Sequence, residues 1–215
     1  MKRREFSVGL GSLGALGVLT VAPAAQAQGG PVEGQHYKRL AQAVPVSTPD
    51  KIEVVEFFSY ACPHCNALEP LVEPWSKRLP ADVKFRRVPV FFQRPQWEFL
   101  QSLYFAVEAT NQLDTLHRKV FAAMHVEHKN IARDADVLTL ATANGADGAK
   151  LVDAMKSFAV QTKVRQAKQL ADAYRVDAVP MLGIQGRWTT GAEAGTHERT
   201  LLVADYLIAQ ARKQG

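Results

Sequence analysis

Cysteine is nearly absent from this sequence: Cys62 and Cys65 are the only two among 215 residues. A framework of long-range disulfides is therefore excluded. A bridge between these two residues would close a very short loop, and the stabilisation from a cross-link falls as its loop shortens. The pair needs an explanation other than fold stability.

Two further features are missing. The longest apolar run, "VGLGSLGALGVLTVA", has 15 residues, whereas a membrane-spanning helix needs about 20. The formal net charge is +5, but the basic residues form no stripe interleaved with aromatic side chains. We therefore predict no nucleic-acid partner.

The N-terminal segment predicts a signal for export. A basic start, "MKRREFS", precedes the 15-residue apolar run, and Pro23 leads to a small-residue cleavage pattern that ends at Ala27. Residues 1–27 are therefore expected to be a cleaved signal peptide. Arg3 and Arg4 fit the twin-arginine route as well as ordinary secretion. Export places the two cysteines in an oxidising compartment.

The first half of the remaining chain alternates between strand and helix. "KIEVVEFF" (51–58) and "VKFRRVPV" (83–90) predict strands, and apolar spacing predicts a helix from Pro63 to about Leu79. Pro70 and Pro74 lie inside this helix, so a kink or an interruption is expected there. A strand–helix–strand unit of this kind makes its two strands parallel.

Helical spacing then continues to about residue 174. "MLGIQ" and "RWTT" predict an antiparallel hairpin turning at Gln185-Gly186, and a last helix follows from about His197 to Lys213. The order indicates an α/β fold, a mixed central sheet flanked by helices, in segments 28–92 and 159–215. Residues 93–158 are expected to form an inserted helical domain.

"CPHC" (62–65) carries the clearest chemistry. At a helix start, the Cys62 sulfur would face free N–H groups and the positive end of the helix dipole, which favour the thiolate. Cys65 lies one turn later and can resolve a mixed disulfide formed by Cys62. Pro63 fixes the turn, and His64 can add a hydrogen bond or positive charge toward the thiolate.

Two alternatives use the same cysteines. A zinc site would need two more ligands; the chain has no second Cys-x-x-Cys, although His125 and His128 are candidates. An inert structural disulfide is disfavoured by the small loop. We favour a redox-active pair, because the motif follows a strand and opens a helix in an exported chain.

Four segments resemble one known family. "EFFSYACPHC" (56–65), "SFAVQ" (157–161), "RVDAVP" (175–180) and "IQGRW" (184–188) resemble the DsbA family of periplasmic thiol:disulfide oxidoreductases, in the thioredoxin superfamily. The resemblance implies a thioredoxin fold with a helical insertion. It also implies an exposed nucleophilic Cys62, a buried Cys65, and a cis Val179–Pro180 bond that faces Cys62 and binds an extended substrate strand.

The resemblance gives Glu56 a role as well. A buried acid at this position helps to move a proton to or from the deeper cysteine, and burial would raise its pKa. A solvent-facing glutamate is the alternative. Family members often pair this acid with a lysine on the next strand; here the matching residue is Arg87, or Arg86 if the alignment slips by one.

The expected function is a periplasmic protein-disulfide oxidase. It would donate the Cys62–Cys65 disulfide to reduced, unfolded exported proteins and be reoxidised by an inner-membrane partner of the DsbB type. No metal or organic cofactor is implied, and a monomer is expected. The alternatives are a periplasmic thiol reductase or isomerase, and a non-catalytic thioredoxin-like chaperone.

Overall fold

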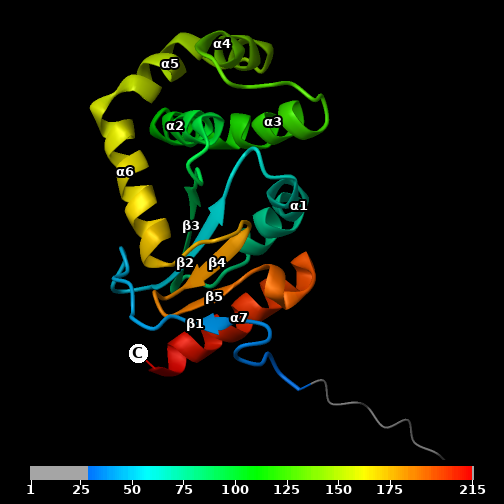
Figure 1. The fold of residues 1–215 in the computed structure, drawn as a ribbon, viewed down its shortest axis with the longest axis vertical. Helices are drawn as coiled ribbons and strands as arrows, with labels where there is room; N and C mark the ends of the chain where they lie inside the picture. Colours follow the sequence, from blue (N-terminus) through cyan, green and yellow to red (C-terminus); the bar gives the residue numbers. More distant parts are fainter. Residues whose placement is uncertain (1–28, 215) are drawn as a thin grey trace, which may run out of the picture. The chain divides into compact units, whose positions relative to one another are not determined.

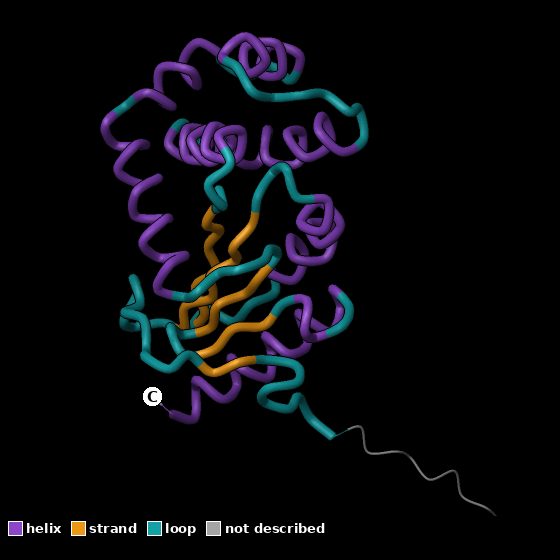
Figure 2. Tube along the Cα trace, viewed as in Figure 1, coloured by secondary structure: helices purple, strands orange, loops and turns teal. Residues whose placement is uncertain are grey.

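The computed structural model describes residues 29–214, so the predicted signal peptide lies outside the described residues. A mixed sheet with the strand order β1-β5-β4-β2-β3 occupies the centre (Figure 2). β2 and β3 are parallel, whereas the other neighbours are antiparallel. The predicted parallel unit and hairpin are thus confirmed. The strands are β1 (Lys38–Arg39), β2 (Ile52–Phe58), β3 (Val83–Pro89), β4 (Met181–Ile184) and β5 (Trp188–Thr190).

Helices flank this sheet, and Figure 1 shows α1 and α6 on opposite sides of it. α2 to α5 lie between β3 and α6 in the chain, where the sequence predicted an insertion. No helix within residues 29–214 is long and apolar enough to cross a membrane. The α-helices are α1 (Pro63–Lys77), α2 (Pro95–Ala109), α3 (Leu113–His125), α4 (Asp134–Ala143), α5 (Gly148–Lys156), α6 (Phe158–Ala173) and α7 (His197–Gln214); a 3-10 turn covers Ala192–Ala194.

Side-chain alternation along β2 divides the core into two clusters. Val54 packs with apolar residues of α1 and α7, whereas Val55 and Phe57 pack with residues of α6 and of the inserted helices. Successive strand residues point to opposite faces, which explains the division. The inserted helices therefore share one hydrophobic cluster with the α6 face of the sheet. Glu56, two residues after Val54, is directed to the α1 face.

α1 continues unbroken through both of its internal prolines, so the expected interruption is wrong. Pro70 and Pro74 are exposed, one turn apart on the solvent side of the helix. The carbonyl groups that lose a backbone donor there can be hydrated. The buried side of the helix keeps its packing through Leu68, Val72 and Trp75.

The hairpin forms as predicted, while β1 was missed. Gln185 and Gly186 have φ values of 51° and 62°, and this left-handed pair suits the twist of a hairpin. β1 has only two residues, Lys38 and Arg39, and both are exposed. Its sequence has no periodicity to recognise, because the strand is defined by its pairing with β5.

The close packing of Gly183 gives a test of the hairpin. An alanine Cβ at this position would lie within 3.0 Å of three atoms of the Tyr174 ring. That ring is fixed against Phe57, and its hydroxyl accepts the N–H of Gly186 at 3.1 Å. We expect Gly183→Ala to lower the free energy of unfolding by about 1–3 kcal/mol, measured by urea denaturation. Gly29→Ala, which meets no atom within 4 Å, is the control and is expected to unfold as the wild type does.

Candidate active site

Cys62 caps the N-terminus of α1. Its backbone is extended (φ −93°, ψ 118°), and Pro63 occupies the first turn, where its missing N–H costs nothing. The N–H of Cys65 donates to the Cys62 sulfur at 3.3 Å, and the N–H of Cys62 donates to the Ser59 carbonyl at 3.0 Å. Both cysteines are in the free thiol form. Sulfur thus takes the place that an oxygen occupies in most helix caps.

The two sulfurs lie in opposite electrostatic environments. A hydrogen bond from the Cys65 thiol is the main cause that lowers the pKa of Cys62 to about 6, and burial opposes this shift. The backbone N–H groups of Cys65 and His64 and the charge of His64 lower the pKa further. For Cys65, burial is the main cause of a pKa well above its ordinary value, and Cys62 adds to it. At neutral pH the reduced pair therefore holds a thiolate at Cys62 and a thiol at Cys65.

Cys62 is less accessible than the resemblance implied. Only 5% of its surface is exposed, so the expectation of an exposed residue is wrong, whereas Cys65 is buried as expected. The small cap side chain lies against the loop that precedes β4, and its Sγ is 3.4 Å from the carbonyl oxygen of Val179. Pro63 and His64 are exposed, and the His64 ring lies 6.3 Å from the His197 ring, between centroids.

The Val179–Pro180 peptide bond is cis, as the resemblance implied. β4 begins at the next residue, Met181, which pairs with Phe57 near the end of β2. This register carries the proline loop to the end of the sheet from which the cysteine helix departs. Val179 and Cys62, 117 positions apart in the chain, therefore come into contact.

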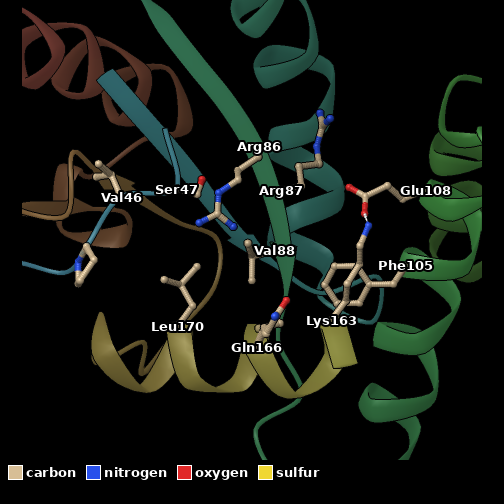
Figure 3. A pocket seen from close by; sticks show the side chains of 12 residues that line it. Val46, Ser47, Arg86, Arg87, Val88, Phe105, Glu108, Lys163, Gln166 and Leu170 are labelled. Atoms are coloured by element: carbon tan, nitrogen blue, oxygen red, sulfur yellow. Dashed lines mark hydrogen bonds and ion pairs between the residues drawn. The ribbon is translucent and has the colours of Figure 1, made fainter. Parts of the chain in front are cut away.

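Glu56 lies buried behind the cysteines, 1% exposed, so the solvent-facing alternative is wrong. Its Oε2 is 3.0 Å from Nε of Arg87, its partner in the strand register. Figure 3 shows Arg86 and Arg87 directed to opposite sides of β3, and the arginine that meets Glu56 is Arg87. Burial raises the pKa of Glu56 to about 7, with Arg87 opposing and Glu69 adding to the shift.

Arg86 forms a second glutamate–arginine pair on the α6 side. It donates to both carboxylate oxygens of Glu53 at 3.0 and 3.2 Å, and the hydroxyl of Ser47 donates to the same group. Burial raises the pKa of Glu53, but these hydrogen bonds outweigh it, so the pKa is lowered. A pocket of about 410 Å³ opens beside Arg86 and is lined also by Arg87, Glu108 and Lys163 (Figure 3).

The sequence analysis missed three buried polar groups beside Glu56. Oε1 of Glu69 accepts a hydrogen bond from Arg87 at 2.7 Å, and its Oε2 lies 3.3 Å from Nε2 of His117. Nδ1 of His117 is 2.8 Å from the hydroxyl of Tyr60. A detectable signal existed: Glu69 and His117 occupy the apolar faces of their helices, where a polar side chain needs a buried partner.

Within the part of the chain that the structure describes, no three His, Cys, Asp or Glu side chains are grouped to hold a metal ion. His125, a candidate zinc ligand, places its Nε2 2.7 Å from the carbonyl oxygen of Tyr60 instead.

Comparison with known proteins agrees with this geometry. The profile of the DSBA-like thioredoxin domain matches residues 53–197. Thiol:disulfide interchange protein DsbA of Bordetella pertussis is 42% identical over 202 residues, 93% of this chain and 94% of its own length. DsbA of Pseudomonas aeruginosa is 41% identical over 83% of this chain and 85% of its own.

Solved structures give the same result at the level of the fold. The crystal structure of Pseudomonas aeruginosa DsbA superposes with a TM-score of 0.82 and 40% identity, covering 86% of this chain and 96% of that one. The DsbA of Xylella fastidiosa superposes with a TM-score of 0.78 at 26% identity, covering 85% of this chain and 98% of its own. The chain therefore belongs to the DSBA-like thioredoxin family and has the thioredoxin fold with a helical insertion.

Proposed function

We propose that this protein is a protein thiol:disulfide oxidase, which donates the Cys62–Cys65 disulfide to newly exported proteins in the periplasm. The observation that carries the proposal is the asymmetry of the two sulfurs, with the pKa of Cys62 lowered to about 6 and that of Cys65 raised. A stabilised thiolate stabilises the reduced form, so the disulfide gives up its oxidising equivalents readily. Membership of the DSBA-like family supports the same activity.

The exchange proceeds in two displacements. A thiolate of the substrate attacks the Cys62 sulfur, a mixed disulfide forms, and Cys65 leaves with the electrons of the broken bond. The second thiolate of the substrate then attacks its own sulfur in that mixed disulfide, and Cys62 leaves as the stabilised thiolate. The substrate has lost two electrons, and the cysteine pair has gained them.

Glu56 supplies the proton that the departing Cys65 needs. A carboxyl with a pKa of about 7 can give and take a proton at neutral pH. Its charge raises the pKa of Cys65, so a thiolate at Cys65 favours a protonated Glu56, and an ionised Glu56 favours the thiol. Pro63 and His64 act on the other sulfur, through the cap geometry and through charge.

Val179 and Pro180 bind the substrate. The Val179 backbone lies against Cys62, so an extended chain that pairs with it would bring its cysteine to the Cys62 sulfur. The signal peptide over residues 1–27 directs export, and the monomeric enzyme is reoxidised by an inner-membrane partner of the DsbB type.

The reduction potential tests this function directly. We expect the protein, equilibrated against glutathione buffers, to have a potential well above the value of thioredoxin, which is about −270 mV. The matched measurement is oxidation of a reduced peptide substrate by wild type and Cys62→Ala, with loss of activity in the variant. A potential at or below that of thioredoxin indicates a reductase, and a Cys62→Ala variant with full activity indicates a chaperone.

Thiolate absorbance near 240 nm tests the asymmetry of the cysteines. In the reduced protein we expect a titration with a midpoint at about pH 6, which is absent from Cys62→Ser. The Cys65→Ser variant keeps the low-pH titration because the hydroxyl can still donate to the Cys62 thiolate. A single transition near pH 9 would contradict the thiolate at Cys62.

Glu56→Gln tests the buried acid. The carboxyl ionises near 4.5 in the unfolded chain but near 7 in the fold, so the wild type loses stability as pH rises between these values. The free energy of unfolding of the variant, relative to wild type, therefore rises by up to about 3 kcal/mol over this range, measured by urea denaturation at successive pH values. Oxidation of the peptide substrate becomes slower or changes its pH profile.

Glu53→Gln is the matched control on the same strand. The pKa of this carboxyl is lowered, so its charge contributes stability above about pH 4.5 that is lost as pH falls through the folded pKa. The variant is therefore expected to be less stable than wild type at pH 7, with the difference shrinking in acid, and to keep the wild-type pH profile of oxidation. Parallel pH dependences in the two variants would contradict the assignment of Glu56.

A further inference from the structure

Two buried carboxylates share one guanidinium behind the cysteines. Arg87 lies 3.0 Å from Oε2 of Glu56 and donates to Oε1 of Glu69 at 2.7 Å. Both glutamates are at most 3% exposed. They come from different elements, β2 and α1, and meet only because both pack against β3 at this point.

The charges of this cluster do not balance when every group has its ordinary ionisation. Arginine stays protonated in proteins, so ionised Glu56 and Glu69 together would leave one uncompensated negative charge in the core. An unpaired buried charge is costly, and two carboxylates at one site avoid it by holding a proton. The surroundings of the two carboxyl groups decide which of them holds that proton.

The surroundings of His117 favour one tautomer. The pKa of Tyr60 is raised well above its ordinary value by burial, so its hydroxyl is protonated and can donate to Nδ1 of His117, 2.8 Å away. Burial also lowers the pKa of His117, and we assign the one proton of the neutral ring to Nε2, because that nitrogen faces a carboxylate. That Nε2 lies 3.3 Å from Oε2 of Glu69.

Aromatic packing holds the ring in this orientation. The centroid of His117 is 5.3 Å from the Tyr60 ring, 5.4 Å from Phe121 and 5.5 Å from Phe58. A ring flip would turn Nε2 away from Glu69 and would break the Tyr60 contact at the same time. α3 of the inserted helices thus places Nε2 of His117 3.3 Å from Oε2 of Glu69, an electrostatic contact without the geometry of a hydrogen bond.

We propose that His117 is a positioning residue of the redox centre: its Nε2–H stabilises the charge on Glu69 and thereby places the shared proton on Glu56. Glu56 is the carboxyl whose charge acts on Cys65. The inference rests on the proposed function in one respect only, namely that the proton on Glu56 is transferred to Cys65 during disulfide exchange. The ionisable groups that face the cluster are Tyr60 from the loop after β2, Glu56 from β2, Cys65, Glu69 and Glu73 from α1, Arg87 from β3, Tyr104 from α2 and His117 from α3.

Two isosteric substitutions separate the two contacts of the ring. The side-chain amide nitrogen of Gln approximates the place of Nε2, and the side-chain oxygen of Asn approximates that of Nδ1. His117→Gln therefore keeps a donor toward Glu69, whereas His117→Asn keeps an acceptor for Tyr60 only. The readout is the titration of the two carboxyl groups in the reduced protein, followed by carbon-13 NMR of labelled glutamate, with Glu56→Gln and Glu69→Gln spectra to assign the signals.

We expect His117→Asn to lower the apparent pKa of Glu56 by about one pH unit or more, because the proton moves to Glu69. The Glu69 signal should shift in the opposite direction. His117→Gln should keep the wild-type titration of both groups. His128→Asn, at an exposed position three residues beyond α3, is the matched control and should change neither titration.

Either of two results would overturn the inference. One is an unchanged Glu56 titration in His117→Asn. The other is an equal shift in both His117 variants, which would assign the effect to packing or to the Tyr60 contact. Thermal unfolding of each variant identifies those that fold. The titration needs no substrate, so a protein that failed as an oxidase could still pass this test, and an active oxidase could fail it.

Discussion

The cap of α1 by Cys62 is the interaction on which the other features of the site depend. The N–H of Cys65 is one of the donors that every helix leaves free at its start, and here its acceptor is sulfur at 3.3 Å. One contact therefore begins the helix, sets the spacing of the two sulfurs and stabilises a thiolate. Cys65, a turn inside the helix and 1% exposed, receives none of this stabilisation. The opposite ionisation of two identical side chains follows from their positions at one helix end.

The buried charges behind the cysteines depend on the same helix. α1 carries Glu69 one turn after Cys65. The packing of α1 against the sheet, which positions the two sulfurs, therefore also brings a second carboxylate to Arg87. The Glu53–Arg86 pair shows how much the surroundings matter. Both glutamates lie on β2 and both meet an arginine of β3, but the pKa of Glu53 is lowered and that of Glu56 is raised. The difference is that Glu53 accepts hydrogen bonds from both Arg86 and Ser47. Glu56 has Arg87 beside it, and Glu69 contacts the same guanidinium.

The inserted helices contribute to the site as well as to the core. α3 contacts the segment before Cys62 twice, through His117 at the Tyr60 hydroxyl and His125 at the Tyr60 carbonyl. These two histidines lie eight positions apart on one face of the helix. The loop that carries the nucleophile is therefore held from the side of the insertion. The proline loop before β4 approaches the same sulfur from the sheet.

The sequence by itself determined the order of elements, the parallel unit, the hairpin and the chemistry of the "CPHC" segment. These follow from local patterns: alternation in 51–58, helical spacing after Pro63, and a cysteine pair at a helix start. The position of Val179, the cis bond and the role of Glu56 came from a resemblance to a family, because no local pattern specifies them. The inward direction of Glu56 follows from strand alternation, which places it on the same face as Val54. The interruption expected at Pro70 and Pro74 was wrong, since a solvent-facing carbonyl that loses its backbone donor can be hydrated at little cost.

Only the tertiary structure decided which charges meet. The register of β2 and β3 paired Glu56 with Arg87 and turned Arg86 to the other face. The docking of α1 and α3 brought Glu69 and His117 to that pair across long separations in the chain. Burial raises the pKa of a carboxyl or a thiol, whereas hydrogen bonds to the charged form lower it. The balance of the two is a property of the assembled core and has no signature in a local stretch of sequence. The two reactive cysteines can therefore be recognised in the sequence, whereas the protonation of the groups around them is determined by packing.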